Sequence, residues 1–254
     1  MLWIRSAFFF VFFILGIVGY AAAIVVASPV ASLAFRRGLA AAWGRYNLRM
    51  LALFCGLRHE IIGAENLPAP PYLIMSKHQS AWETVVFYGL FPSLVWALKK
   101  ELAHIPFFGW ALQATQQIFI DRAHPTEAMK QLLVRSQEEF KRGSSLVVFP
   151  EGTRMAPGKV GDYKAGGIGV AVAAGVPIVA VAHNAGLFWG RREFVKRPGV
   201  IRVRIAPPIA THQLGRRERQ ALLERVKESI EGMMAEIGCP GEADLPPAGG
   251  PEES

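Results

Sequence analysis

The sequence contains little cysteine and comparatively few charged residues. Only Cys55 and Cys239 occur among its 254 residues, and neither belongs to a Cys-x-x-Cys pair or a cysteine–histidine cluster. This spacing excludes a disulfide framework and a structural zinc site, and it favours a reducing compartment. Charged residues make up 19% of the chain, with 28 basic and 20 acidic side chains. The formal charge of +8 favours an anionic partner, which composition alone leaves open between nucleic acid, a phosphorylated substrate and acidic membrane lipid.

Two familiar catalytic motifs are also missing from the chain. No Gly-x-Ser-x-Gly sequence occurs, which argues against the nucleophile elbow of the serine hydrolases. No His-Glu-x-x-His sequence occurs either, and the histidines are scattered. We therefore expect no metal ion and no other cofactor.

Apolar residues, in contrast, are abundant at 52% of the chain, and the mean hydropathy is positive. Residues 7–27, AFFFVFFILGIVGYAAAIVVA, carry no charge and are about long enough to cross the hydrocarbon core of a membrane. Arg5 alone precedes this run. The arginines that follow it are Arg36, Arg37, Arg45 and Arg49. If the run spans, the positive-inside rule predicts a cytoplasmic main domain and an inner-membrane location. The alternative is a signal peptide, because VASPVAS resembles a cleavage site, although the run is longer than a typical signal core.

Three regions are expected along the chain. A second apolar patch at residues 48–57 predicts either an interfacial helix that lies against the membrane or a core helix of the main domain. We therefore assign residues 1–58 to membrane-anchoring helices and residues 59–238 to a single catalytic domain. Residues 239–254, rich in proline, glycine and glutamate, are expected to form a disordered tail.

The main domain alternates short apolar runs with helical patterns. The predicted strands are residues 72–75, 94–98, 117–120, 145–149, 177–182 and 200–205. The predicted helices are residues 81–90, 125–142, 165–174 and 216–237. This alternation predicts an α/β fold in which a mixed sheet is flanked by helices, with an N-terminal membrane helix or helical hairpin.

A histidine and a glutamate lie five positions apart in SKHQSAWE, residues 76–83. On a regular helix they would point about 140° apart, so they can meet only if the helix begins between them. Ser80 and Glu83 form a capping-box pattern that would start the helix at Ser80 and leave His78 on the loop after a strand. The carboxyl end of a strand is where α/β folds place their sites. Glu83 can thus be a helix cap, a partner of His78, or both.

Two further strand ends carry charge. The predicted strand at 145–149 runs into PEGTR, where Arg154 could grip a phosphate, Gly152 could let backbone amides approach an anion, and Glu151 could accept a hydrogen bond from a hydroxyl. The strand at 117–120 ends in Asp121 and Arg122, a second candidate phosphate contact. The alternative in both places is a surface ion pair. Three charged strand ends predict one shared pocket.

The sequence resembles the glycerolipid acyltransferase family, which includes the 1-acylglycerol-3-phosphate acyltransferases. HQSAWE, IFIDR, FPEGTR and GVPIVAVA occur in the order of the four motif blocks of that family, over residues 72–182. The resemblance implies that His78 is the catalytic base, that Arg122 and Arg154 hold the substrate phosphate, and that Glu151, with Gly152 and Thr153 of the same motif, helps seat the acceptor. The segment 98–109, LKKELAHIPFFG, also resembles the family and implies a basic phosphate contact, for which we favour Lys100 over Lys99.

The chain departs from the family pattern at two positions. Glu83 stands where aspartate is more common, and Ala180 stands where the fourth block usually carries proline. The extra methylene moves the carboxylate of Glu83 by roughly one bond length, which a small backbone adjustment can absorb. The expected catalytic pair is therefore His78 and Glu83.

The resemblance implies transfer of a fatty acyl group, from coenzyme A or acyl carrier protein, to the 2-hydroxyl of a lysophosphatidate at an anionic membrane surface. His78 would remove the hydroxyl proton and Glu83 would orient the imidazole. Glycerol 3-phosphate or another lysolipid remains open as acceptor. A membrane-lipid hydrolase and a non-enzymatic lipid- or nucleic-acid-binding protein are the alternatives, but neither accounts for four ordered motif blocks, so no nucleic-acid partner is expected.

Overall fold

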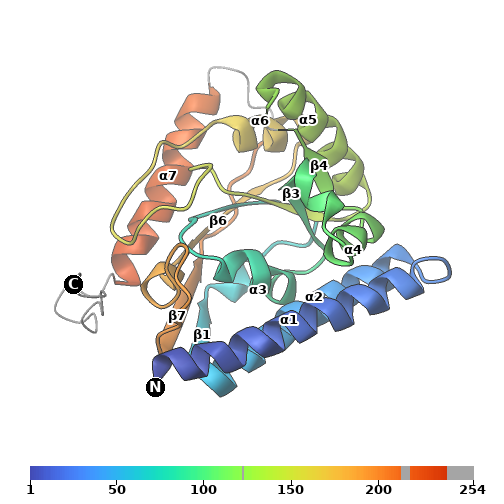
Figure 1. Ribbon diagram of the computed structural model, residues 1–254. Coiled ribbons are helices and arrows are strands. Elements are labelled where there is room, and N and C mark those ends of the chain that lie inside the picture. Colours follow the sequence, from blue (N-terminus) through green and yellow to red (C-terminus); the bar gives the residue numbers. More distant parts are fainter. Residues whose placement is uncertain (122, 213–217, 239–254) are drawn as a thin grey trace.

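The computed structural model describes residues 1–121, 123–212 and 218–238, which form one seven-stranded sheet flanked by helices (Figure 1). The strands are β1 (Leu57–Ile62), β2 (Leu73–Ser76), β3 (Leu94–Lys99), β4 (Ile118–Ile120), β5 (Ser145–Val148), β6 (Ile178–His183) and β7 (Gly199–Ile205). The α-helices are α1 (Leu2–Ala27), α2 (Leu33–Met50), α3 (Trp82–Leu90), α4 (Phe108–Ala114), α5 (Pro125–Lys141), α6 (Gly166–Ala174) and α7 (Glu218–Glu236). Short helical segments are η1 (Leu51–Cys55), η2 (Ala64–Asn66), η3 (Lys100–His104) and η4 (Ala185–Leu187).

The order of the strands brings most of their carboxyl ends to one edge of the sheet. The strands follow one another as β1-β7-β6-β2-β5-β3-β4, and only the β6–β7 pair is antiparallel. Strands β6, β2, β5, β3 and β4 therefore run in the same direction. The loops that leave them therefore converge on one side of the domain. The antiparallel β6–β7 pair beside these parallel strands makes the sheet mixed, which confirms the predicted α/β fold.

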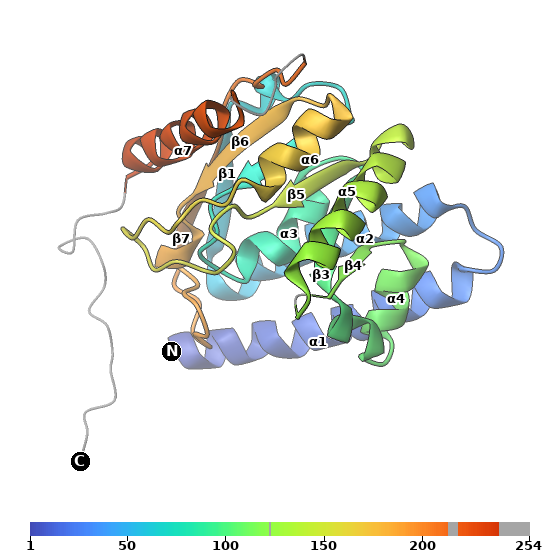
Figure 2. The same cartoon turned by 90° about the horizontal axis from the view of Figure 1, so that it is seen from above.

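The two faces of the sheet bury separate hydrophobic cores. In β2 the side chains alternate, so that Leu73 and Met75 face one core while Tyr72 and Ile74 face the other. The first core lies under α5, α6 and α7, and the second lies under α3, η1 and part of α1. Figure 2 shows α5, α6 and α7 on one face of the sheet, with α1 and α2 on the far side of α3.

The N-terminal helices pack against the domain along their length. α1 contacts α2, η1 and α4, and α2 packs closely on α3. At the α2–α3 crossing, a Cβ added to Gly44 would lie 2.5 Å from the backbone nitrogen of Gly89, so the two backbones touch. α1 is also the one helix in the described part of the chain that is long and apolar enough to cross a membrane.

Most predicted elements are present. All six predicted strands occur with ends within one residue of the expected positions, as do the helices predicted at 81–90, 125–142 and 165–174. α7 matches the predicted C-terminal helix from Glu218 onward, while residues 216–217 and the predicted tail at 239–254 lie outside the described residues. Strand β1 and helix α4 were not predicted. The division at residue 58 stays a prediction, although β1 already starts at Leu57.

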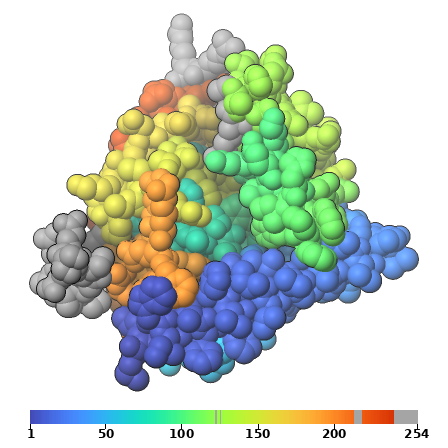
Figure 3. All heavy atoms as spheres, viewed as in Figure 1, coloured from blue at the N-terminus to red at the C-terminus, as the bar shows by residue number. Residues whose placement is uncertain are grey.

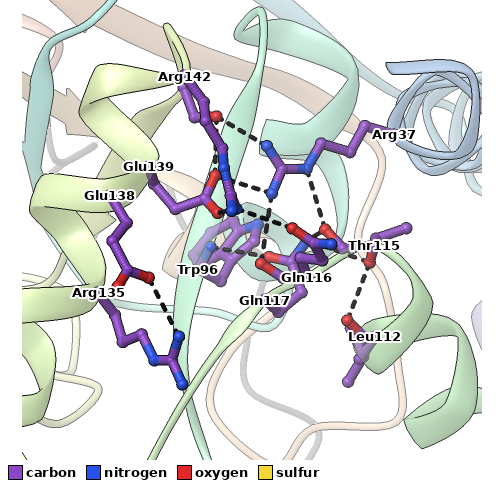
Figure 4. Close-up of polar contacts among 11 residues, drawn as sticks. Arg37, Trp96, Leu112, Thr115, Gln116, Gln117, Arg135, Glu138, Glu139 and Arg142 are labelled. Atoms are coloured by element: carbon purple, nitrogen blue, oxygen red, sulfur yellow. Dashed lines mark hydrogen bonds and ion pairs between the residues drawn. The ribbon is translucent and has the colours of Figure 1, made fainter. Parts of the chain in front are cut away.

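Two of the arginines after the apolar run form hydrogen bonds with backbone carbonyls of the main domain. Arg36 donates from Nη1 to the carbonyl oxygen of Ala114 at 2.7 Å, and Arg37 donates from Nε to that of Thr115 at 2.9 Å. Both carbonyls lie at the C-terminal end of α4, where a cation is favourable. Arg37 also pairs with the buried carboxylate of Glu139 on α5 at 2.9 Å (Figure 4). These contacts fix the α1–α2 hairpin on the domain.

Candidate active site

The site lies where the loops after β2 and β5 meet. His78 follows β2 by two residues, and Gly152, Thr153 and Arg154 lie on the loop after β5. The backbone N–H of Met155 donates to the carbonyl oxygen of His78 at 2.8 Å, which joins the two loops. The topology therefore brings together the candidate base and the candidate phosphate loop.

His78 and Glu83 form a hydrogen-bonded pair. His78 Nδ1 lies 2.8 Å from Oε1 of Glu83, whose side chain is fully buried. The same Oε1 accepts hydrogen bonds from the backbone N–H groups of Gln79, at 2.9 Å, and Ser80, at 2.8 Å. α3 begins at Trp82, so the chain between the two residues is a turn and the two side chains can meet. Glu83 is therefore both a cap of the helix start and the partner of the histidine.

The surroundings of Glu83 keep its carboxyl group ionised. Burial alone would raise the pKa of Glu83, but the field of His183 and the hydrogen bonds from His78 and the Ser80 amide hold it below its usual value. Because an ionised carboxylate only accepts hydrogen bonds, Nδ1 of His78 carries the proton. The lone pair of the imidazole is then on Nε2, as a general base requires.

The His78 ring is held from a second side by Phe149. The two rings stack with centroids 3.9 Å apart and planes 11° from parallel. The His78 side chain is 13% exposed and lies on the wall of a cavity. Stacking and the bond to Glu83 fix the ring plane while one edge remains accessible.

His183, at the end of β6, lies beside this pair and was not predicted as a site residue. Its ring is fully buried, with Nε2 at 2.9 Å from the carbonyl oxygen of Lys77 and 3.9 Å from Oε2 of Glu83. Nδ1 accepts the backbone N–H of Ala185 at 3.4 Å, so the proton of the neutral ring is on Nε2. His183 thus holds the peptide that precedes His78 and presents an N–H dipole to Glu83.

The candidate phosphate loop opens onto the same cavity. Gly152 has φ of +68°, a conformation that glycine adopts without strain. Arg154 is partly buried, and its Nε donates to the carbonyl oxygen of Ser80 at 2.7 Å. This bond uses only Nε, so the terminal nitrogens of the guanidinium can form the paired hydrogen bonds that a phosphate accepts. Thr153 is exposed beside them.

The remaining predicted substrate contacts are Lys100, Arg122 and Glu151. Lys100 pairs with Asp121 at 2.5 Å, which joins the loops after β3 and β4 at the same edge of the sheet. The hydrogen bond from the Lys100 ammonium lowers the pKa of Asp121 to about 2. Arg122 lies outside the described residues. Glu151 is buried, and its carboxylate points inward to the ammonium group of Lys77 at 2.8 Å.

An apolar cavity of about 530 Å³ extends from His78 and Arg154 into the molecule. Its walls come from α1, through Phe13, Ile17 and Ile24, and from η3 and α4, through Leu102 and Leu112. In Figure 3 the surface is hollowed between the yellow loop after β5 and the green segment of η3 and α4, above the blue ridge of α1. The arrangement places a general base and a guanidinium at one end of a space suited to a hydrocarbon chain.

The described residues contain no group of three or more histidine, cysteine, aspartate or glutamate side chains arranged to hold a metal ion. The expectation that no cofactor is required stays a prediction. The site as described can remove a proton from a hydroxyl group or water next to an anionic headgroup.

Two site features were missed because the sequence signal for each was weak. His183 directly follows the predicted strand 177–182, and a polar residue at the end of a buried strand is a usable signal. Lys77 lies inside SKHQSAWE, but nothing in the sequence separates a buried lysine from the far commoner exposed one.

The comparisons with known proteins agree in both sequence and fold. The sequence model of the Acyltransferase family matches residues 58–184. The chain is 42% identical to a 1-acyl-sn-glycerol-3-phosphate acyltransferase of Pseudomonas aeruginosa, over 77% of this chain and 76% of that protein. It is 30% identical to the enzyme of that name from Saccharomyces cerevisiae, over 84% and 72% of the two chains.

One solved structure has the same fold. The crystal structure of the 1-acyl-sn-glycerophosphate (LPA) acyltransferase PlsC from Thermotoga maritima matches with a TM-score of 0.77 and 23% identity. The match covers 93% of this chain and 96% of that one.

The burial of His183 predicts a pH dependence of stability. Burial lowers the pKa of His183, so the folded protein keeps this ring neutral at a pH where the unfolded chain, with an ordinary pKa near 6.5, takes up a proton. The free energy of unfolding should fall as pH drops below about 6.5. Denaturant titrations at about pH 7.5 and 5.5 should show a smaller loss for His183→Gln than for the wild type. His104→Gln, at an exposed position of η3, is the control and should keep the wild-type loss. Equal losses in all three proteins would contradict the assignment.

Proposed function

The chain belongs to the Acyltransferase family, and from this premise we propose that it transfers a fatty acyl group from an acyl thioester to the 2-hydroxyl of 1-acylglycerol 3-phosphate, forming phosphatidate. The donor is coenzyme A or acyl carrier protein. The observation that carries the proposal is the position of His78 and Arg154 together at the polar end of an apolar cavity. The activity for which the relatives from Pseudomonas and yeast are named supports the choice of acceptor.

The proposed reaction begins with proton removal. Nε2 of His78 takes the proton of the 2-hydroxyl while the oxygen attacks the thioester carbonyl, because an alcohol does not ionise near neutral pH. Glu83, 2.8 Å from Nδ1, stabilises the imidazolium that forms. The tetrahedral intermediate then breaks its C–S bond, and the departing thiolate receives the proton from His78. The products are the ester and a free thiol, with no covalent acyl-enzyme.

The substrate phosphate is assigned to the charged loops at the same edge of the sheet. Arg154 and the backbone of Thr153 would bind it from the loop after β5, in the turn that the positive φ of Gly152 allows. Lys100 would approach from the loop after β3. Arg122, which lies outside the described residues, is proposed as a further phosphate contact. We assign Glu151, whose carboxylate points inward, to fixing this loop.

The fatty acyl chain of the donor is assigned to the apolar cavity, whose walls come from α1, α3, β3 and α4. The volume of about 530 Å³ and the apolar lining suit a long hydrocarbon chain. The chain would then run from the thioester carbonyl beside His78 into the interior.

Membrane docking is assigned to the outward face of α1. Trp3, Phe8 and Leu15 are each more than half exposed, as is Leu53 on η1. A continuous exposed apolar face of this kind marks a lipid-contacting surface. Because α1 packs on α2, η1 and α4, we propose that it lies within the cytoplasmic leaflet of the inner membrane. The basic character of the chain would favour anionic lipid.

The first test is an acyl-transfer assay on the detergent-extracted protein and its His78→Ala variant. The donor is a labelled fatty acyl thioester of either coenzyme A or acyl carrier protein. Each donor is supplied with lysophosphatidate, glycerol 3-phosphate or lysolipids that lack a bare phosphate. We expect phosphatidate selectively from lysophosphatidate, and a loss of turnover on the order of 10²-fold or more in His78→Ala, because the base is gone. Transfer to another acceptor would reassign the substrate. Thioester hydrolysis without an acylated product would favour a hydrolase.

Filling the cavity should shorten the acyl chain that the enzyme prefers. Ala111 is buried on the cavity wall, and Ala111→Phe would occupy part of the space. We expect kcat/KM for long-chain thioesters to fall by roughly tenfold or more while short-chain thioesters are little affected, since only the long chains reach the added ring. The matched control is Val134→Phe, at an exposed position of α5. An equal fall for all chain lengths would reject the cavity as the acyl site.

The placement of α1 in one leaflet predicts the accessibility of its N-terminal end, because a spanning α1 would carry that end to the side opposite the main domain. Met1 is 100% exposed. A cysteine inserted directly after Met1, in a Cys55→Ala and Cys239→Ala background, should react with a membrane-impermeant thiol reagent added from the cytoplasmic side of inverted vesicles. Reaction only from the opposite side would show that α1 crosses the membrane.

A further inference from the structure

A lysine lies buried immediately before the catalytic histidine. The Lys77 side chain is 1% exposed, and lysine is rarely buried unless its charge is paired. Its ammonium group donates to Oε1 of Glu151 at 2.8 Å, to Oε1 of Glu231 at 2.8 Å and to the carbonyl oxygen of Lys159 at 3.0 Å. An ammonium group has three N–H donors, so each has an acceptor.

These three acceptors come from different parts of the chain. Glu151 lies on the loop after β5, directly before Gly152, Lys159 lies further along the same loop, and Glu231 projects from α7. The ammonium of Lys77 therefore ties the β2 loop, the phosphate loop and the C-terminal helix to one point.

Glu151 connects the ammonium group of Lys77 to the main chain of His78, the proposed base. Oε2 of Glu151 accepts the backbone N–H of His78 at 3.2 Å, while Oε1 accepts the N–H of Gly161 at 3.1 Å. The backbone N–H of Lys77 is in turn bound to the carbonyl oxygen of Val181 on β6 at 3.0 Å. One carboxylate thus fixes both the main chain of His78 and the far end of the phosphate loop.

The charges in this cluster depend on Lys77. The Glu151 side chain has no exposed surface, and that of Glu231 is 24% exposed. Tyr163 donates its hydroxyl to Glu231 at 2.7 Å, and burial together with Glu231 raises the pKa of Tyr163 far above its usual value, so it remains a donor. His183, on the neighbouring strand, is neutral. Lys77 is therefore the cation that compensates two carboxylates within this cluster.

We propose that Lys77 is a positioning residue for the proposed acyl transfer: its buried ammonium compensates the charge of Glu151, and Glu151 in turn holds His78 and the phosphate loop in register. The inference rests on the proposed function, because the reaction supplies the readout. A buried carboxylate that loses its cation is strongly unfavourable, whereas removal of both charges is tolerated far better.

The test compares Lys77→Met with the double variant Lys77→Met/Glu151→Gln. In the single variant Glu151 is left buried without its cation, and kcat should fall on the order of 10²-fold with a smaller change in KM for the thioester. In the double variant both charges are gone and the glutamine oxygen can still accept the His78 N–H. Its kcat should recover to within roughly tenfold of the wild type. The matched control is Lys141→Met, at an exposed position at the end of α5.

The pH profile separates charge compensation from a loss of packing. Glu151 and Glu231 face each other's charge in Lys77→Met, with Tyr163, His78 and His183 as the other titratable neighbours. Loss of the cation should raise the carboxyl pKa, so that low pH protonates one of them and relieves the repulsion. The ratio of wild-type to Lys77→Met turnover should therefore increase between about pH 6 and 8.

The melting temperature and the turnover of each variant are compared with those of the wild type. A Lys77→Met protein with near-normal turnover would overturn the proposal. So would a double variant that fails to fold, or that folds but is no more active than the single variant, because charge compensation would then be irrelevant. If the wild type itself transfers no acyl group, the proposed function fails, and that result is separate from any difference between the variants.

Discussion

The structure of the site depends on one carboxylate oxygen that is shared by three donors. Oε1 of Glu83 accepts the imidazole N–H of His78 and two backbone N–H groups at the start of α3. A buried carboxylate is tolerated only when such donors compensate its charge. The two amides therefore permit the ionised Glu83, and the ionised Glu83 fixes the histidine tautomer. The helix start and the His78–Glu83 pair are one structural unit, because removing either set of bonds would leave the carboxylate under-compensated.

The same constraint recurs one residue earlier in the chain. Lys77 and Glu151 form a second buried pair of opposite charges, and Glu151 also accepts the backbone N–H of His78. His183 adds a neutral donor to the Lys77 carbonyl. His78 is thus held through its ring, its amide and the preceding carbonyl by residues from α3, the loop after β5 and the end of β6. A base held at so many points loses little entropy when it reacts, which is the benefit of a preorganised site.

The sequence predicted the elements whose signal is local. Buried strands such as 178–183 are short apolar runs between turn residues, and their ends were correct to within one residue. Strand β1 was missed because LRHEII is an edge strand in which Leu57 alone is buried, so its pattern lacks an apolar face. The pairing of His78 with Glu83 could be inferred from the capping box. The burial of Lys77 could not, because its two carboxylate partners lie 74 and 154 residues away, and only the tertiary fold brings them there. For the same reason Arg37 was interpreted as a flank of the apolar run rather than as a partner of Glu139.

Helix α1 belongs both to the wall of the cavity and to the outer surface of the protein. Its inward side chains, such as Phe13 and Ile17, line the cavity that ends at His78, while its outward side chains are exposed and apolar. A helix that is apolar on all sides is stable only if both faces are covered, and the protein covers one of them. If lipid covers the other, as proposed, release from the membrane would expose the outer face and weaken the packing of the cavity wall. The shape of the cavity, and with it the position of the acyl chain relative to His78, would then depend on whether the enzyme is bound to lipid. Arg36 and Arg37 limit this effect at the α4 end of the hairpin, where they tie α2 to the domain.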